Sequence, residues 1–239
     1  MPERFDVSNR GLTELPGEIR AMRELRELYI YDNQLSTLPA WIGELTELRV
    51  LDANRNRFAS LPDSLGDLSN LYYLYVSDQQ RLGVLPDTIG QLRSLAYLNA
   101  SHDALTTLPS TIGELTSLVE LRFDDNALTE LPDGVRKLGK LRELHLTSNQ
   151  LRELPHWIED VRSLRRLGLR NNKLRELPES LGALSELRDL DLRGNELRVL
   201  PDVIGRLPSL ERLDLRWNPP GAAPTWLGAL EARGCTVWR

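Results

Sequence analysis

Cysteine is almost absent from this chain, since Cys235 is the only one among 239 residues. A lone cysteine cannot close an intrachain disulfide, so we expect the protein in a reducing, cytoplasmic compartment. The chain also lacks an apolar run of the roughly 18 residues that cross a bilayer. Its first residues, MPERF, show neither the basic nor the apolar part of a secretory signal. These absences predict no membrane span.

Lysine is scarce too, because arginine outnumbers it 27 to 3. The net charge is -5, which argues against nucleic acid as a partner. We interpret the arginine-rich, lysine-poor composition as codon bias in a GC-rich, bacterial genome. The chain has no glycine-rich phosphate loop and no cluster of cysteine and histidine. We therefore expect no cofactor and no enzymatic activity.

What the chain has in abundance is a repeat. Leu-Pro pairs recur every 23 residues, apart from one step of 24 between Pro62 and Pro86, and Pro224 keeps the interval after Ala223. A period of 20–50 residues predicts a solenoid, in which each unit buries its apolar side only against its neighbours. Residues 1–239 should therefore form a single elongated domain. The Leu-Pro prolines are Pro16, Pro39, Pro62, Pro86, Pro109, Pro132, Pro155, Pro178 and Pro201.

One repeat shows the local structure that the pattern predicts. Leu144 and Leu146 alternate with polar residues, which indicates a short strand with its leucines inside. Asn149 ends the strand, where its amide can satisfy buried backbone groups of the turn and of the adjacent repeat. The residues after Pro155 have apolar spacing of three to four, which predicts a short helix or 3₁₀ turn. The equivalent asparagines are Asn33, Asn56, Asn126, Asn149, Asn172, Asn195 and Asn218.

In consensus form the repeat reads LxxLxLxxNxLxxLPxxIGxLxx, most cleanly in LRELHLTSNQLRELPHWI and LRDLDLRGNELRVLPDVIG. This pattern resembles the 23-residue leucine-rich repeat class of plant intracellular Ras-group proteins, Scribble-type scaffolds and many bacterial proteins. The resemblance covers residues 5–226. It implies an α/β solenoid of about ten repeats, with parallel strands on the concave face and short helices or 3₁₀ turns on the convex face. It also implies protein–protein binding through the concave face, and it supplies no catalytic residues.

The two ends and one inner unit depart from the repeat. Residues 1–15 form a degenerate first unit, expected to be an N-terminal cap, and residues 219–239 should form a C-terminal cap of one helix and a final strand. An extra residue near 79–81 makes the 24-residue step, and Asp103 follows where an asparagine belongs. The side chains expected to cover the core at the C-terminal end are Trp226, Leu227, Leu230 and Trp238.

Side chains that point outward from the strands form rows along the concave face. All six tyrosines fall in the predicted strand segments and five of them on these rows, and tyrosine is enriched in binding surfaces. In the C-terminal half arginines alternate with aspartates, which indicates either a self-neutralised ladder or a site for an acidic ligand beside the gap at Gly168. The candidate partner-binding residues are Tyr29, Tyr31, Tyr73, Tyr75, Tyr97, Asn99, Arg122, His145, Arg170, Arg193, Arg216 and Trp217.

Other functions stay open at this point. The chain could be the recognition arm of a larger bacterial effector or signalling enzyme, such as a ligase or kinase, and could be delivered to a host cell. Asp78, His102 and Asp125 occupy equivalent positions in successive repeats, so a metal ion or small ligand could bind at this concave edge. Homo-oligomerisation is neither implied nor opposed by the sequence. The favoured hypothesis is a binding module for one protein partner.

Overall fold

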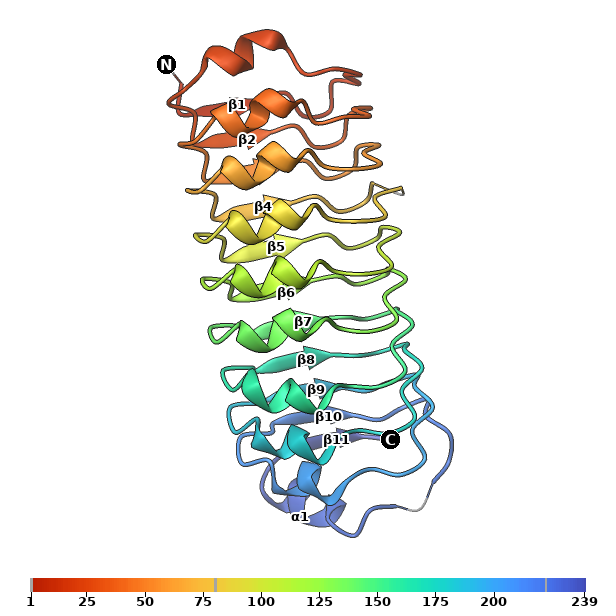
Figure 1. The fold of residues 1–239 in the computed structure, drawn as a ribbon. Coiled ribbons are helices and arrows are strands. Elements are labelled where there is room, and N and C mark those ends of the chain that lie inside the picture. Colours follow the sequence, from red (N-terminus) through yellow and green to blue (C-terminus); the bar gives the residue numbers. More distant parts are fainter. Residues whose placement is uncertain (1, 80, 222) are drawn as a thin grey trace.

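The computed structural model describes residues 2–79, 81–221 and 223–239. Its strands form one open sheet in which every strand pairs in parallel with the next one along the chain. Figure 1 shows these strands stacked in order from the N-terminus to the C-terminus, which is the solenoid that the repeat predicts. The strands are β1 Arg4–Asp6, β2 Glu27–Tyr29, β3 Val50–Asp52, β4 Tyr73–Tyr75, β5 Tyr97–Asn99, β6 Glu120–Arg122, β7 Glu143–His145, β8 Arg166–Gly168, β9 Asp189–Asp191, β10 Arg212–Asp214 and β11 Thr236–Trp238.

Each Leu-Pro pair is followed by a short 3₁₀ helix. The proline ring holds the backbone extended just before the helix, as at Pro155 with φ -67°. The Pro155 carbonyl accepts the first hydrogen bond of the helix, from the N–H of Ile158 at 3.0 Å. Only the C-terminal cap contains an α-helix among the described residues, α1 at Leu227–Ala232. The 3₁₀ helices are η1 Gly17–Ala21, η2 Ala40–Glu44, η3 Asp63–Asp67, η4 Asp87–Gln91, η5 Ser110–Glu114, η6 Asp133–Lys137, η7 His156–Asp160, η8 Glu179–Ala183 and η9 Asp202–Arg206.

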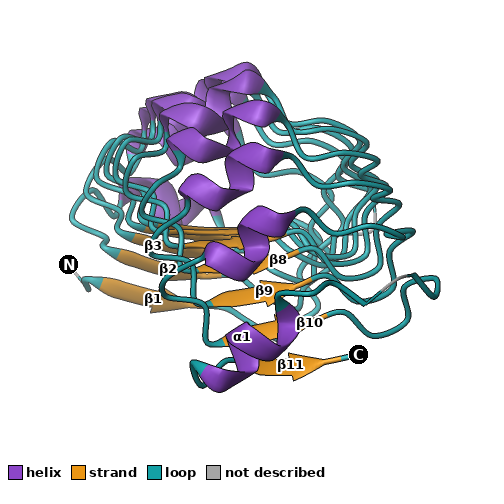
Figure 2. Cartoon of the chain, turned by 90° about the horizontal axis from the view of Figure 1, so that it is seen from below, coloured by secondary structure: helices purple, strands orange, loops and turns teal. Residues whose placement is uncertain are grey.

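The core lies between these two layers. Figure 2 shows the helices gathered on one side and the strands on the other. The middle residue of most strands is a fully buried leucine, as at Leu144, and Phe58 and Phe123 are the largest fully buried side chains. Trp41 and Trp157 are partly buried and pack against the core. The flanking residues of each strand point away from this core, which leaves the open face of the sheet to carry function.

The asparagines form the predicted ladder. Asn149 Oδ1 accepts the N–H of Leu128 at 3.0 Å, while its amide donates to the Phe123 and Leu146 carbonyls at 2.8 and 3.2 Å. In the irregular unit Gln79 takes the asparagine position, because its amide donates to the Ala53 carbonyl at 2.9 Å. The bulge expected at the extra residue falls on residue 80, outside the described residues.

The C-terminal cap contains the predicted helix and strand, with one correction. Strand β11 pairs in parallel with β10, and Val237 packs against the core. Trp238 was expected to cover the core, but it is 38% exposed and lies in register with Asp214 on the open face. The prediction was wrong because alternation along a strand sends neighbours to opposite faces, and Val237 takes the inner one. None of the helices within the described residues has the length and apolarity to cross a membrane.

Candidate concave binding face

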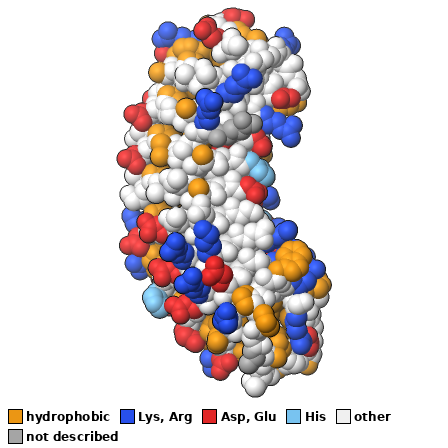
Figure 3. Space-filling view, turned by 90° about the vertical axis from the view of Figure 1, so that its right-hand side faces the viewer, with side chains coloured by type: hydrophobic (Ala, Val, Ile, Leu, Met, Phe, Trp, Pro, Cys, Tyr) orange, Lys and Arg blue, Asp and Glu red, His pale blue; other side chains and the backbone are white. Residues whose placement is uncertain are grey.

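The strand register places the predicted rows side by side. Tyr73 lies opposite Tyr97, and Tyr75 lies opposite Asn99. The strands are three residues long, so Tyr31 and Tyr72 flank them rather than lie within them, contrary to the prediction that all six tyrosines occupy strands. Figure 3 shows the molecule as an arc, whose hollow side carries these rows.

A cluster of aromatic rings, here called the tyrosine cluster, lies over β4 and β5. The ring centroids of Tyr75 and Tyr97 are 4.9 Å apart, and Tyr73 lies 6.2 and 6.4 Å from Tyr97 and Tyr75. Tyr72, which is not among the predicted binding residues, adds an edge contact to Tyr73 with ring centroids 4.8 Å apart. Tyr72 and Tyr73 are 45% and 39% exposed. The cluster is thus a preformed aromatic surface that is open to solvent.

The remaining tyrosines do not join this cluster. Tyr29 donates a hydrogen bond to Glu27 at 3.2 Å, and the guanidinium of Arg4 lies 4.5 Å from its ring centroid. Asp52 stands between Tyr29 and Tyr75 in the row. The five tyrosines predicted as one surface therefore divide into the cluster on β4 and β5 and a separate pair, Tyr29 and Tyr31.

Burial raises the pKa of the Tyr75 phenol above its ordinary value of 10.0, and it raises that of Tyr97 in the same way. The unfolded chain then loses these protons first, so the associated stability is complete below about pH 10 and is lost as the pH rises further. We expect the thermal midpoint to fall more steeply between about pH 9 and 11 for wild type than for a Tyr75→Phe/Tyr97→Phe variant. Parallel profiles in a calorimetric pH series would contradict this expectation.

The centre of the face is an ion-pair network. His145 Nε2 lies 3.1 Å from Glu143 Oε2, which also pairs with Arg166 at 2.9 Å, and Arg122 pairs with Glu120. Glu120, Glu143 and His145 are the one group of three potential metal ligands among the described residues whose ligand atoms lie within 4.8 Å of one another. Because arginines already neutralise both carboxylates, we interpret the group as a network that fixes the strand surface.

Asp78, His102 and Asp125, the alternative metal ligands, are not among the converging groups of the described residues. His102 Nδ1 lies 3.5 Å from Asp125 Oδ2. All three residues have positive φ, between 52° and 60°, so they occupy the same left-handed turn position in successive repeats. Aspartate and histidine tolerate that conformation better than most residues, which explains their presence there without a metal.

The C-terminal half combines arginines with an exposed indole. The guanidinium carbons of Arg170, Arg193 and Arg216 lie 5.3, 5.9 and 5.6 Å from the ring centroid of Trp217, which is 64% exposed. Trp217 also occupies the left-handed turn position, with φ 63°, although a bulky side chain is disfavoured there. Burial raises the pKa of Asp214, but hydrogen bonds from Arg216 hold it below its ordinary value. Figure 3 shows basic and hydrophobic side chains adjoining on the lower part of the hollow side.

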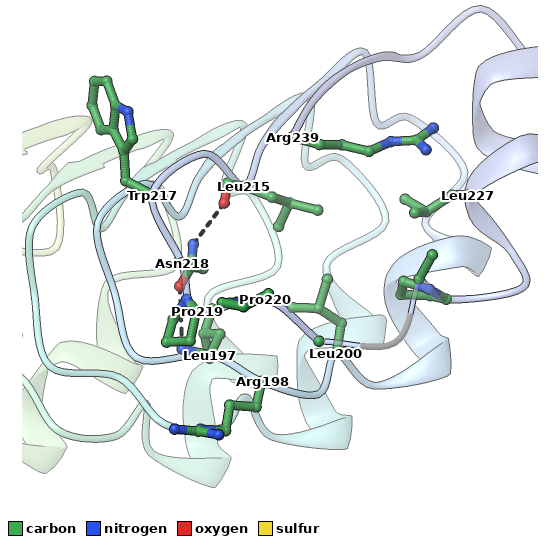
Figure 4. A pocket seen from close by; sticks show the side chains of 13 residues that line it. Leu197, Arg198, Leu200, Leu215, Trp217, Asn218, Pro219, Pro220, Leu227 and Arg239 are labelled. Atoms are coloured by element: carbon green, nitrogen blue, oxygen red, sulfur yellow. Dashed lines mark hydrogen bonds between the residues drawn. The ribbon is translucent and has the colours of Figure 1, made fainter.

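A pocket of about 250 Å³ lies beside this region, between the last repeat and the cap. Its apolar walls include Leu200, Leu215 and Leu227, and Asn218 bonds the backbone of Leu197 and Leu215 beneath it. Figure 4 shows the indole of Trp217 directed away from the other lining residues. The pocket is small for a ligand site, whereas the indole is available on the concave side.

Comparison with known proteins agrees with this architecture. A model described as a leucine-rich repeat region matches residues 13–98 and 64–160, and a second leucine rich repeat model matches residues 162–219. The chain belongs to the leucine-rich repeat family. No curated protein matches this leucine-rich repeat chain.

Solved structures extend the likeness across almost the whole chain. The leucine-rich repeat protein LIC12759 of Leptospira interrogans is 32% identical, with a TM-score of 0.89 over 95% of this chain and 64% of its own. The ectodomain of the receptor kinase GASSHO1/SCHENGEN3 of Arabidopsis thaliana, in complex with CASPARIAN STRIP INTEGRITY FACTOR 2, is 29% identical, with a TM-score of 0.81 over 90% of this chain and 27% of its own. The plant peptide hormone receptor RGFR1, in complex with RGF2, is 28% identical, with a TM-score of 0.75 over 90% and 39%. This leucine-rich repeat chain spans less than two thirds of the length of each.

Proposed function

We propose that this protein is a non-enzymatic binding module of the 23-residue repeat class, and that its concave face engages one protein partner. The observation that carries the proposal is the tyrosine cluster, in which ring contacts at 4.9–6.4 Å join Tyr73, Tyr75 and Tyr97 on the open side of the sheet. Rigid aromatic side chains offer large contact area at little entropic cost, and they dominate binding energy where they are buried by a partner.

Two further observations support this function. Tyr72 and Tyr73 are exposed and lie in contact, and contiguous exposed apolar patches mark interaction sites in soluble proteins. The plant receptors with a similar fold are described in complex with a peptide hormone or a named protein factor. A cytoplasmic location and a bacterial origin belong to the same proposal; the single cysteine supports the first, and the arginine-rich, lysine-poor composition supports the second.

The proposal is tested with two matched variants as baits in a lysate of the source cells. We expect the Tyr73→Ala/Tyr75→Ala/Tyr97→Ala variant to lose a protein that wild type retains, by roughly 30-fold or more, because each hot-spot aromatic contributes about 2 kcal/mol or more. The Tyr29→Ala/Tyr31→Ala variant removes tyrosines outside the cluster and should retain the same protein. Circular dichroism confirms that both variants are folded. Equal recovery with all three baits would rule out the tyrosine cluster as the anchor.

A further inference from the structure

Two consecutive repeats hold an arginine with an aspartate two residues earlier. Asp191 Oδ1 accepts the backbone N–H of Arg193 at 3.2 Å and its Nε at 2.8 Å. Asp214 Oδ1 accepts the backbone N–H of Arg216 at 3.3 Å and its Nε at 2.9 Å. In both repeats one carboxylate therefore binds the same two donors of one arginine, at the same place on the concave face.

The preceding repeat has the arginine without the aspartate. Strand pairing puts Gly168 in register with Asp191, so Arg170 corresponds to Arg193. Within the described parts of the chain, neither the backbone N–H of Arg170 nor its buried Nε has an acceptor, and its guanidinium forms no ion pair. Buried donors without acceptors are uncommon and costly, so the buried Nε of Arg170 calls for an explanation.

Gly168 is itself buried, and the atoms nearest to its Cβ position include two polar side-chain atoms. A Cβ built on Gly168 would have Thr147 Oγ1 at 3.7 Å and His145 Nδ1 at 3.8 Å as its nearest polar neighbours, with nothing closer. This is ordinary van der Waals separation, so a Cβ fits at Gly168, in the position that Asp191 and Asp214 take in the next two repeats. The Trp217 indole lies 5.3 Å from the Arg170 guanidinium and provides an apolar wall beside it.

We propose that an aspartate or glutamate side chain of the protein partner binds Arg170. Its carboxylate takes the position that Asp191 has beside Arg193 and that Asp214 has beside Arg216. The partner's carboxylate accepts hydrogen bonds from the backbone N–H and the Nε of Arg170. The backbone of the partner lies against Trp217. A carboxylate is favoured because the neighbouring repeats show that one satisfies both donors. The inference rests on the proposed function, since it names the chemistry of the segment that the concave face binds.

The position of the site suits an extended segment that also reaches the tyrosine cluster. Strands β5 and β8 are three steps apart in the sheet, or roughly 14 Å at the usual strand spacing. An extended chain covers that distance in about four to five residues. One acidic side chain at Arg170 and an apolar contact at the tyrosine cluster therefore fit within a single short stretch of a partner.

The test is a selection from random 12-residue peptides displayed on phage and fused to the coat protein at their C-termini, so that only side chains supply carboxylates. Selection runs in parallel on wild type, Gly168→Asp and Gly168→Ala. The first variant supplies an internal carboxylate to Arg170, and the second fills the same space without charge. We expect peptides enriched in aspartate and glutamate on wild type and Gly168→Ala. We expect these peptides to bind Gly168→Asp at least tenfold more weakly in calorimetric titrations.

Arg170→Gln is a second variant that removes the cation and leaves Gly168 unchanged. It should weaken the same peptides at least tenfold, so the test does not depend on the folding of Gly168→Asp. The inference would be overturned if wild type enriched no peptides, or if the enriched peptides had no excess of acidic residues. It would also be overturned if the peptides bound Gly168→Asp and Arg170→Gln as tightly as wild type. Peptides insensitive to both variants, yet lost with the tyrosine-cluster variant, would overturn only this inference and leave the proposed function standing.

Discussion

Replacing Asn149 by alanine is expected to lower the free energy of unfolding by about 3 kcal/mol, because one side chain serves three buried backbone groups. The Leu128 N–H loses its acceptor at 3.0 Å and stays buried, which costs about 1–3 kcal/mol. The Phe123 and Leu146 carbonyls lose one donor each. The Phe123 carbonyl keeps the amide of Asn126 as a donor, and the Leu146 carbonyl keeps that of Asn172. The two lost bonds add about 0.5–1.5 kcal/mol each.

Urea unfolding followed by circular dichroism measures this loss, with Gln150→Ala as the matched control. Gln150 is the next residue and is exposed, and its side chain accepts a hydrogen bond from Lys173 at 3.2 Å. Its removal should change stability by less than about 0.5 kcal/mol. If Asn149→Ala unfolds at the same urea concentration as Gln150→Ala, the ladder does not stabilise the repeats in the way proposed.

The periodic features of the fold were predictable because each repeat meets the same physical demands. Leucines at fixed spacing must be buried, and a strand end among them needs an amide that both donates and accepts, so Asn149 and its equivalents follow from the sequence. The asparagine pattern did not predict Gln79, because glutamine differs in type, although its amide donates to the Ala53 carbonyl in the same manner.

The site was only partly predictable, because the rows are periodic whereas contacts across them depend on side-chain length and direction. Sequence placed Tyr73, Tyr75 and Tyr97 on one face, but it did not show that Tyr29 turns to Glu27 instead. The gap at Gly168 was visible in the sequence. Its link to Arg170 required the geometry in which Asp191 binds the backbone and the guanidinium of Arg193 together.

Replacing Gly113 by alanine is expected to destabilise the protein by about 2–3 kcal/mol, although the same change is stabilising where space allows. A Cβ at Gly113 would lie 2.2 Å from the Gly134 carbonyl oxygen, far inside contact distance. The atoms in the way belong to the backbone of η6, so the two convex helices must move apart. Arg136 and Glu159 occupy positions equivalent to Gly113 in the next two repeats, which shows that the fold accommodates a side chain there when its helices are spaced for it.

Gly139→Ala is the matched control, because a Cβ at Gly139 would meet no atom within 4 Å. That variant should be unchanged or stabilised, by about 0.4–1 kcal/mol, through the lower entropy of its unfolded chain. The two substitutions are chemically identical and are expected to differ in sign in urea unfolding. A Gly113→Ala protein as stable as Gly139→Ala would mean that the convex helices separate freely. The glycine of the repeat would then not set the spacing of the helices, and so would not determine the curvature that makes the strand face concave.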